Sequence, residues 1–338
     1  MNWNEYEKWV KHLGEWGAEY HRTLRARPVR AQTKPGEIAQ QLAQSAPETG
    51  TSMTEIMSDF ERIVMPGMTH WQHPRFFAYF PANASPPSML ADIITSTMAA
   101  QCMLWQTSPA ATEMETKVID WLRQAIGLPN EFQGVIQDSA SGATLAAVLT
   151  MRERAIEWTG NTSGLNNKGQ LRIYCSDQVH SSIDRAVWIA GIGAENIVRI
   201  PSGGPLYALD CDALNNAIES DIAAGHTPIG VIACTGGTSI GACDDIAGVI
   251  SVAKRHDLYV HVDAAWAGSA MICPEFQTLW SGVEQADSIV FNPHKWLGAQ
   301  FDCSAHFLRN PDDLVRTLAI QPEYLKTHGQ DGLINYSE

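Results

Sequence analysis

The chain has 338 residues, enough for about two domains of ordinary size, which excludes a miniprotein. It carries 23 Lys and Arg residues against 37 Asp and Glu residues, and the resulting net charge of −14 excludes the basic surface that a nucleic-acid backbone requires. Charged residues make up 18% and hydrophobic residues 45%, so the chain must bury a large core, a subunit interface or both, and we expect an oligomer.

Apolar side chains recur at alternating spacings of three and four near the N-terminus, which predicts one amphipathic helix. The stripe consists of Trp3, Tyr6, Val10, Leu13, Gly17, Tyr20 and Leu24. The pattern alone leaves two partners for this face, the protein's own core and a neighbouring subunit. The Pro-containing arm at residues 27–36 favours the neighbour, so we expect residues 1–80 to be a helical dimerisation segment of a homodimer.

Further helices are predicted at residues 51–64 and 109–126. Between them, residues 73–81 are too aromatic and too rich in proline for a helix. From residue 135, short β-branched runs alternate with helix-length segments, which is typical of βαβ units. The predicted strands are residues 171–175, 196–200, 228–234, 258–262 and 288–291. This alternation predicts an α/β fold, with a mostly parallel sheet flanked by helices.

The seven cysteines are scattered and never in C-x-x-C spacing, so neither a disulfide framework nor a metal site is predicted. The first residues lack a basic region followed by an apolar run, and no apolar stretch of about 18 residues occurs. We therefore expect a cytoplasmic protein with no membrane partner.

Chemically distinctive residues follow four of the predicted strands. They are His180, Thr238, Asp263 and Lys295. Because ligands of parallel sheets bind at the carboxyl ends of strands, we expect these side chains to share one site. Residues 139–141, Ser-Ala-Ser, begin a helix-like segment, and a helix N-terminus is a favourable position for an anion.

This set of residues indicates a pyridoxal-phosphate site. Burial at a strand end lowers the pKa of a lysine such as Lys295, so that it can form a Schiff base. Asp263 would pair with a pyridinium nitrogen, which at an effective dielectric constant near 20 contributes about 4 kcal/mol, or about three pKa units. The phosphate would bind at residues 139–141. Each feature alone has an ordinary structural explanation, such as a turn or a helix cap; Asp263 and Lys295 together are far more specific.

Six segments carry motifs of a known family: residues 76–81, 108–110, 134–141, 176–182, 261–269 and 292–296. The last two read His-Val-Asp-Ala-Ala-Trp-Ala-Gly-Ser and Asn-Pro-His-Lys-Trp. Over nearly its whole length the chain resembles the pyridoxal-phosphate-dependent aromatic-L-amino-acid decarboxylases. The resemblance implies an aminotransferase-like large domain at residues 81–316, the start of a catalytic loop at 317–338, and a C-terminal domain that this chain does not include.

The resemblance also implies roles for individual residues. Lys295 is the Schiff-base lysine, Asp263 the partner of the pyridine nitrogen, and His180 the ring stacked on the cofactor. Tyr324, in a polar loop, is the implied catalytic acid. The implied cofactor-binding residues are Ser139, Ala140, Ser141, His180, Thr238, Asp263, Ala265, Asn292, His294 and Lys295. The expected substrate-binding residues are Trp71, Tyr79, Phe80, Pro81, Ala82, Trp105 and His180.

The implied reaction is decarboxylation of an aromatic L-amino acid of the tryptophan, tyrosine, phenylalanine or dopa type. Ala82 stands where Thr is common in the family and Trp266 where Tyr or Met is familiar, which affects substrate preference rather than cofactor use. The alternatives are an aldehyde synthase with the same cofactor, an aminotransferase or glutamate-type decarboxylase on the same fold, and a non-catalytic dimerisation fragment. The presence of His180 and Tyr324 favours the decarboxylase over the aldehyde synthase.

Overall fold

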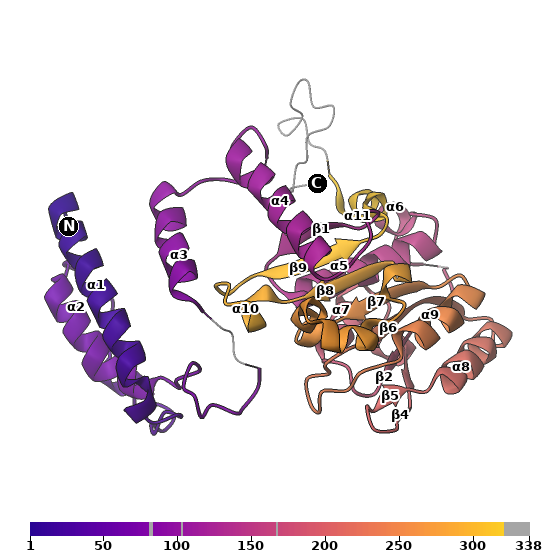
Figure 1. Cartoon of the computed structure of the whole chain (residues 1–338), viewed down its shortest axis with the longest axis horizontal. Coiled ribbons are helices and arrows are strands. Elements are labelled where there is room, and N and C mark those ends of the chain that lie inside the picture. The colour runs from indigo at the N-terminus through magenta and orange to yellow at the C-terminus, as the bar shows by residue number, and fades with distance from the viewer. Residues whose placement is uncertain (81–83, 103, 167, 321–338) are drawn as a thin grey trace. The chain divides into compact units, whose positions relative to one another are not determined.

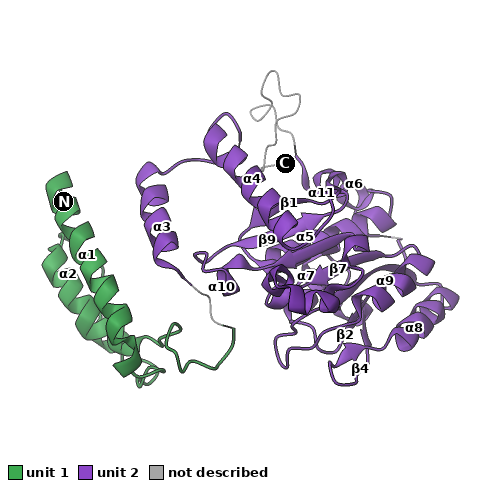
Figure 2. Cartoon of the chain, viewed as in Figure 1, with its two compact units in different colours: residues 1–82 green, residues 83–338 purple. Residues whose placement is uncertain are grey.

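The computed structural model of the protein describes residues 1–80, 84–102, 104–166 and 168–320. The chain divides into two compact units, residues 1–82 and residues 83–338 (Figure 2). The first unit is helical, and the second contains the sheet. Among the residues described, no helix combines the length and the apolar character needed to cross a membrane.

Each α-helix of the N-terminal unit begins with a capping box. The N-cap side chain accepts a hydrogen bond from the backbone N–H of a glutamate three residues later, and the side chain of that glutamate accepts one from the N-cap N–H. Helix α1 spans Trp3–Thr23, and α2 spans Met53–Asp59. The short π-helix Phe60–Val64 follows α2 directly. The helix predicted at residues 51–64 is therefore present, but its hydrogen bonding changes at Phe60.

The aromatic side chains of α1 are divided between packing and exposure. Trp16 stacks on Tyr20 with ring centroids 5.5 Å apart, and it meets Phe60 edge to face at 5.4 Å. Trp3, near the start of the helix, is 80% exposed. Apolar surface therefore remains at the end of α1 that the sequence assigns to a second subunit, and that assignment stays a prediction.

The larger unit is built on a seven-stranded sheet in the order β1-β9-β8-β7-β6-β2-β3 (Figure 1). Strand β9 pairs antiparallel with β1 and β8, and the other neighbours pair in parallel. This confirms the predicted mostly parallel sheet. The strands are β1 Gln133–Gln137, β2 Leu171–Ser176, β3 Ile197–Ile200, β6 Thr227–Cys234, β7 Tyr259–Asp263, β8 Ser288–Phe291 and β9 Ser304–Leu308, with a separate ribbon of β4 Ser202–Gly203 and β5 Ala208–Leu209.

Helices pack against both faces of the sheet, and successive side chains of one strand point to opposite faces. On β6, Val231 and Ala233 belong to the hydrophobic cluster that includes α8 and α9, whereas Ile232 belongs to the cluster that includes α7. The helices of this unit are α3 Pro86–Met98, α4 Pro109–Ala125, α5 Ala140–Ala155, α6 Gly160–Ser163, α7 Ser182–Ile189, α8 Cys211–Ala223, α9 Ile246–Arg255, α10 Pro293–Trp296 and α11 Pro311–Leu318.

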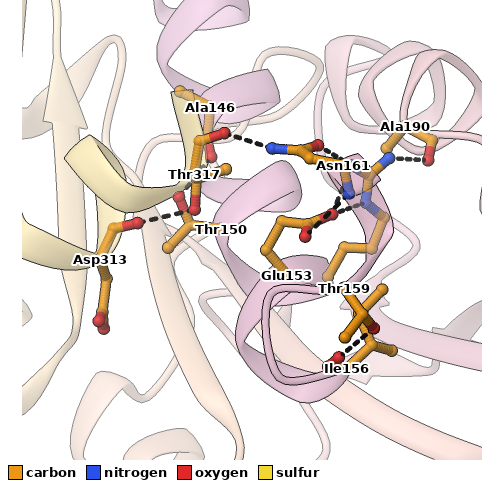
Figure 3. Close-up of polar contacts among 10 residues, drawn as sticks. Ala146, Thr150, Glu153, Ile156, Thr159, Asn161, Ala190, Asp313 and Thr317 are labelled. Carbon is orange, nitrogen blue, oxygen red and sulfur yellow. Dashed lines mark hydrogen bonds and ion pairs between the residues drawn. The ribbon is translucent and has the colours of Figure 1, made fainter. Parts of the chain in front are cut away.

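A buried ionic network holds the C-terminal end of α5 (Figure 3). Glu153, which is fully buried, accepts hydrogen bonds from Nη2 of Arg152 at 2.6 Å and from the N–H of Asn161 at 3.2 Å. Arg152 Nη1 also donates to the carbonyl of Ala190, at the end of α7, at 2.7 Å. Asn161 Nδ2 donates to the carbonyl of Thr317, in α11, at 2.6 Å. The network therefore joins α5, α7 and α11.

Replacing Glu153 with glutamine should lower the free energy of unfolding by about 3 kcal/mol, because it leaves the guanidinium group of Arg152 buried without its anion. Urea unfolding followed by circular dichroism measures this change. Glu157→Gln is the matched control, since this carboxylate is exposed just beyond the same helix, and it should change the free energy by less than about 0.5 kcal/mol. Equal stability of the two variants would contradict the prediction.

Candidate active site

The carboxyl ends of β2, β6, β7 and β8 surround a cavity of about 330 Å³ in the larger unit. Every residue predicted to bind the cofactor lines this cavity. The lining residues are Ser139, Ala140, Ser141, His180, Ser182, Cys234, Gly236, Gly237, Thr238, Asp263, Ala265, Trp266, Asn292, His294, Lys295 and Phe301. The sheet topology thus brings together side chains that are widely separated in the sequence.

The N-terminus of α5 forms one part of the cavity wall. Ser139 is its N-cap, and its Oγ accepts a hydrogen bond from the N–H of Gly142 at 3.1 Å. Ala140 and Ser141 follow in the first turn of the helix. The partial positive charge at the N-terminus of a helix favours an anionic group at this position. Nearby, Oδ1 of Asn292 accepts from Oγ of Ser304 at 2.7 Å, which fixes the amide.

Asp263, the last residue of β7, is 6% exposed. Its Oδ1 accepts a hydrogen bond from the N–H of Ala265 at 3.1 Å. Burial raises the pKa of this carboxyl group, whereas the hydrogen bond from Ala265 and the positive charges of Lys295 and His180 act in the opposite direction. A buried carboxylate of this kind is stabilised when a cation binds beside it.

Lys295 lies in α10, the short helix directly after β8. Burial lowers the pKa of its amine, and the negative charge of Asp263 partly opposes that effect. A lowered pKa increases the fraction of neutral amine, which is the form that attacks a carbonyl group. The cavity therefore contains a potential nucleophile and a buried acid that are electrostatically coupled.

The two histidines of the cavity have defined orientations. Nδ1 of His180 accepts from the backbone N–H of Ser182 at 3.1 Å, and Nδ1 of His294 accepts from the N–H of Cys303 at 3.0 Å. A ring nitrogen that accepts carries no proton, so the neutral form of each ring carries its proton on Nε2. Burial and the charge of Lys295 lower the pKa of His294.

The sequence does not predict several of the lining residues, namely Ser182, Cys234, Gly236, Gly237 and Phe301. Gly236 has a φ of +83°, and a Cβ atom there would lie 2.6 Å from Cβ of Ala267, so the turn after β6 requires glycine. The Gly-Gly pair directly after a predicted strand was an available signal for this turn. Phe301, whose ring lies 4.6 Å from that of His294, follows no such signal.

Most of the expected substrate-binding residues are not part of this lining. Trp71, Tyr79 and Phe80 belong to the unit of residues 1–82, where Trp71 stacks on Tyr79 at 5.7 Å. Trp105 donates a hydrogen bond from Nε1 to Glu113 at 3.0 Å, and the described lining of the cavity does not include it. Pro81, Ala82 and Tyr324 lie outside the described residues. The substrate and acid roles of these residues stay predictions.

Two buried histidines lie in the strands beside the cavity. His261 precedes Asp263 on β7, and its Nδ1 contacts Oγ of Ser288 at 2.7 Å. The ring of His306, on β9, meets that of His261 edge to face at 5.8 Å. Neither nitrogen of His306 has a hydrogen-bond partner among the described residues. Burial lowers the pKa of His306 to about 4.

The low pKa of His306 predicts a loss of stability in acid. The unfolded chain binds a proton at this histidine near pH 6.5, before the folded protein does, so stability falls by about 3 kcal/mol as the pH drops from about 6.5 to about 4. His306→Met should remove this part of the pH dependence in urea unfolding. His12→Met, at an exposed position of α1, should leave it unchanged. Parallel pH curves for His306→Met and the wild type would contradict the prediction.

Comparison with known proteins identifies the family of the chain. The family model described as the pyridoxal-dependent decarboxylase conserved domain matches residues 35–336. The chain is 40% identical over 347 residues to the aromatic-L-amino-acid decarboxylase of Sus scrofa, a match that covers 99% of this chain and 71% of that protein.

Solved structures agree with this assignment. Oryza sativa TDC, crystallised with PLP and tryptamine, superposes with a TM-score of 0.95 at 36% identity. The match covers 100% of this chain and 71% of the Oryza sativa chain. The 4-hydroxyphenylacetaldehyde synthase of Rhodiola rosea superposes with a TM-score of 0.90 at 36% identity, covering 100% and 72%. The sequence motifs, the geometry of the cavity and these matches lead to one conclusion: the chain belongs to the pyridoxal-dependent decarboxylase family.

Proposed function

We propose that this protein uses pyridoxal 5′-phosphate to decarboxylate an aromatic L-amino acid to the corresponding amine and carbon dioxide. The observation that carries the proposal is that Asp263, Lys295 and the N-terminus of α5 all line one cavity. An acid, an amine and an anion site match the pyridine nitrogen, the aldehyde and the phosphate of this cofactor. The similarity to aromatic-L-amino-acid decarboxylase supports the class of substrate.

The residues of the cavity fit the cofactor in number and in chemical type. Ser139, Ala140, Ser141 and Asn292 would hold the phosphate, with the dipole of α5 behind them. Asp263 would bind the protonated pyridine nitrogen, which resolves the unfavourable burial of its carboxylate. Lys295 would hold the aldehyde carbon. His180, Ala265, Thr238 and His294 would complete the walls of the site.

Each side chain has a distinct part in the reaction. When bound, pyridoxal 5′-phosphate supplies an electron sink for the electron pair that remains after the carboxylate leaves. Asp263 would favour the protonated form of the pyridine nitrogen, because a buried carboxylate strongly favours a neighbouring cation. Burial lowers the pKa of Lys295, which increases the fraction of its amine in the neutral form. His180, with its proton on Nε2, presents a fixed ring face and one donor to the site.

Tyr324 would return a proton to the substrate Cα, as the resemblance implies. Tyr324→Phe should therefore reduce amine formation by about a hundredfold, the lower range for loss of a general acid. Without that proton, amino acid, dioxygen and water would yield aldehyde, carbon dioxide, ammonia and hydrogen peroxide. Tyr207→Phe, at an exposed tyrosine, is the matched control and should release amine at the wild-type rate. Wild-type amine release by Tyr324→Phe would contradict this role.

The product profile of the protein tests the proposed function. The whole chain, incubated with pyridoxal 5′-phosphate, is supplied in turn with tryptophan, tyrosine, phenylalanine, dopa and glutamate. We expect amine and carbon dioxide in equal amounts from at least one aromatic substrate and none from glutamate. Absence of amine from every aromatic substrate would contradict the proposal.

An aromatic aldehyde synthase is the second candidate, and the similarity to the Rhodiola rosea enzyme is the observation that supports it. The two functions differ in their products from the same substrate. Stoichiometric aldehyde and hydrogen peroxide in the same assay would assign the synthase activity, whereas amine without peroxide assigns the decarboxylase.

We further propose that the protein is a cytoplasmic homodimer. Exposed apolar side chains on α1 and α3, including Trp3 at 80%, Leu90 at 61% and Met98 at 65%, provide apolar surface for a second subunit. All seven cysteines are free, which suits a reducing compartment. Sedimentation at micromolar concentration should give twice the mass of the chain, and a monomer would contradict the dimer.

A further inference from the structure

Trp266 lies where several cavity-lining segments meet. It follows Asp263 in the loop after β7, and its side chain lines the cavity. Its indole meets that of Trp296 edge to face, with ring centroids 5.1 Å apart and an interplanar angle of 77°. Trp296 is the residue directly after Lys295. The contact therefore joins the loop that follows Asp263 to the helix that carries Lys295.

The same indole also lies against the turn that follows β6. A Cβ atom at Gly236 would come within 2.9 Å of Cε3 of Trp266. Real Cβ atoms do not approach a ring atom so closely, so only glycine lets the turn reach this position. Trp266 is thus packed between the end of β6 and the helix after β8.

Helix α10 needs a tertiary contact of this kind because it is only four residues long. Isolated helices of one turn have almost no intrinsic stability. A backbone hydrogen bond of 3.1 Å from the N–H of Asn292 to the carbonyl of Ala265 holds the residue before the helix. The Trp266–Trp296 contact holds its last residue. Lys295 lies between these two attachments, so the position of its backbone depends on both.

We propose that Trp266 is a positioning residue, whose contact with Trp296 fixes the helix that carries Lys295 relative to the loop that follows Asp263. The inference rests on the proposed function, because Lys295 and Asp263 would hold the same cofactor. An edge-to-face aromatic pair stabilises a structure by more than its buried area alone contributes. Without it, the amine of Lys295 samples positions away from the aldehyde carbon, and the cofactor binds less tightly.

Cofactor affinity tests this inference. The full chain and its variants Trp266→Ala, Trp296→Ala and the double variant are titrated with pyridoxal 5′-phosphate, and Kd is read from the visible absorbance of the lysine-bound cofactor. Each single substitution should raise Kd by about threefold to tenfold, the range that one aromatic pair supplies. The double variant should raise Kd no further than the weaker-binding single variant, because both substitutions remove the same contact. Trp266→Phe, which keeps an aromatic ring at this position, should bind pyridoxal 5′-phosphate more tightly than Trp266→Ala and almost as tightly as the wild type.

Trp188→Ala is the matched control, since this indole is 56% exposed on α7, and its Kd should equal that of the wild type. An unchanged Kd in Trp266→Ala overturns the inference, and so do additive effects in the double variant. If Trp266→Ala does not fold, the other two variants decide. Weak cofactor binding by Trp296→Ala together with normal cofactor binding by Trp266→Phe supports the inference. Normal cofactor binding by Trp296→Ala overturns it.

These readouts do not depend on product formation. A wild-type protein that binds the cofactor but releases no amine would contradict the proposed function, and the titrations would still decide the role of Trp266. A wild-type protein that binds no cofactor would overturn both.

Discussion

Lys295→Ala should abolish amine formation, lowering kcat/KM by at least about a thousandfold, because no other cavity-lining residue in the described part of the chain is a lysine. The visible absorbance of the lysine-bound cofactor should disappear with it. A thousandfold loss corresponds to about 4 kcal/mol of transition-state stabilisation, which exceeds what ordinary packing changes cause. The measurement is amine release at saturating cofactor, together with an absorbance spectrum of the purified protein.

Lys254→Ala is the control for the loss of a lysine. Its Nζ donates to Oε1 of Gln285 at 2.6 Å on the surface, away from the residues that line the cavity. This variant should keep the wild-type spectrum and the wild-type rate. Persistence of the visible band in Lys295→Ala would assign the Schiff base to a different amine and would invalidate the proposed site.

Asp263→Asn should reduce kcat by about a thousandfold with little change in the fold. The asparagine Oδ1 can still accept the hydrogen bond from the N–H of Ala265, so the geometry of the loop is retained. Only the negative charge is lost. That charge is worth about 4 kcal/mol to a neighbouring cation at an effective dielectric constant near 20. Its loss should therefore lower the pKa of a pyridine nitrogen held at this position by about three pH units. The electron sink is weakened accordingly.

A spectroscopic pH titration of the bound cofactor separates this effect from misfolding. The absorbance change that reports the pyridine proton should move to lower pH in Asp263→Asn, while the unfolding free energy stays equal or rises, since burial of the charged carboxylate is unfavourable without the cofactor. Asp257→Asn, whose native side chain is 95% exposed, serves as the control. Identical titrations for Asp263→Asn and wild type would contradict the role of Asp263.

The central parallel strands β6, β7 and β8 could be predicted closely because they are largely buried on both faces. Each is a short run of β-branched and apolar residues, and the predicted strand at residues 288–291 coincides with β8. The antiparallel strand β9 has no such signature: Ser304–Leu308 contains no β-branched residue and is inserted between β8 and β1. Its position depends on pairing between distant segments, which a local pattern does not encode.

The same distinction applies to the site. His180, Thr238, Asp263 and Lys295 were identifiable because each lies at or just after the end of a strand, and strand ends are recognisable in the sequence. Phe301 was not, because it lies in the connection between α10 and β9, where the chain returns to the cavity without a local signal. The contact between Trp266 and Trp296 was also beyond prediction, since it depends on the way the loop after β7 packs against α10.

The sequence by itself determined which chemical groups the protein offers and which segments become parallel strands, because both depend on residue type and local periodicity. Only the tertiary structure decided that Asp263 and Lys295 are buried beside one cavity. Burial is created when β7 pairs with β6 and β8 and helices cover the sheet, and that desolvation raises the pKa of the acid and lowers that of the amine. The reactive state of these two groups is therefore a property of the fold.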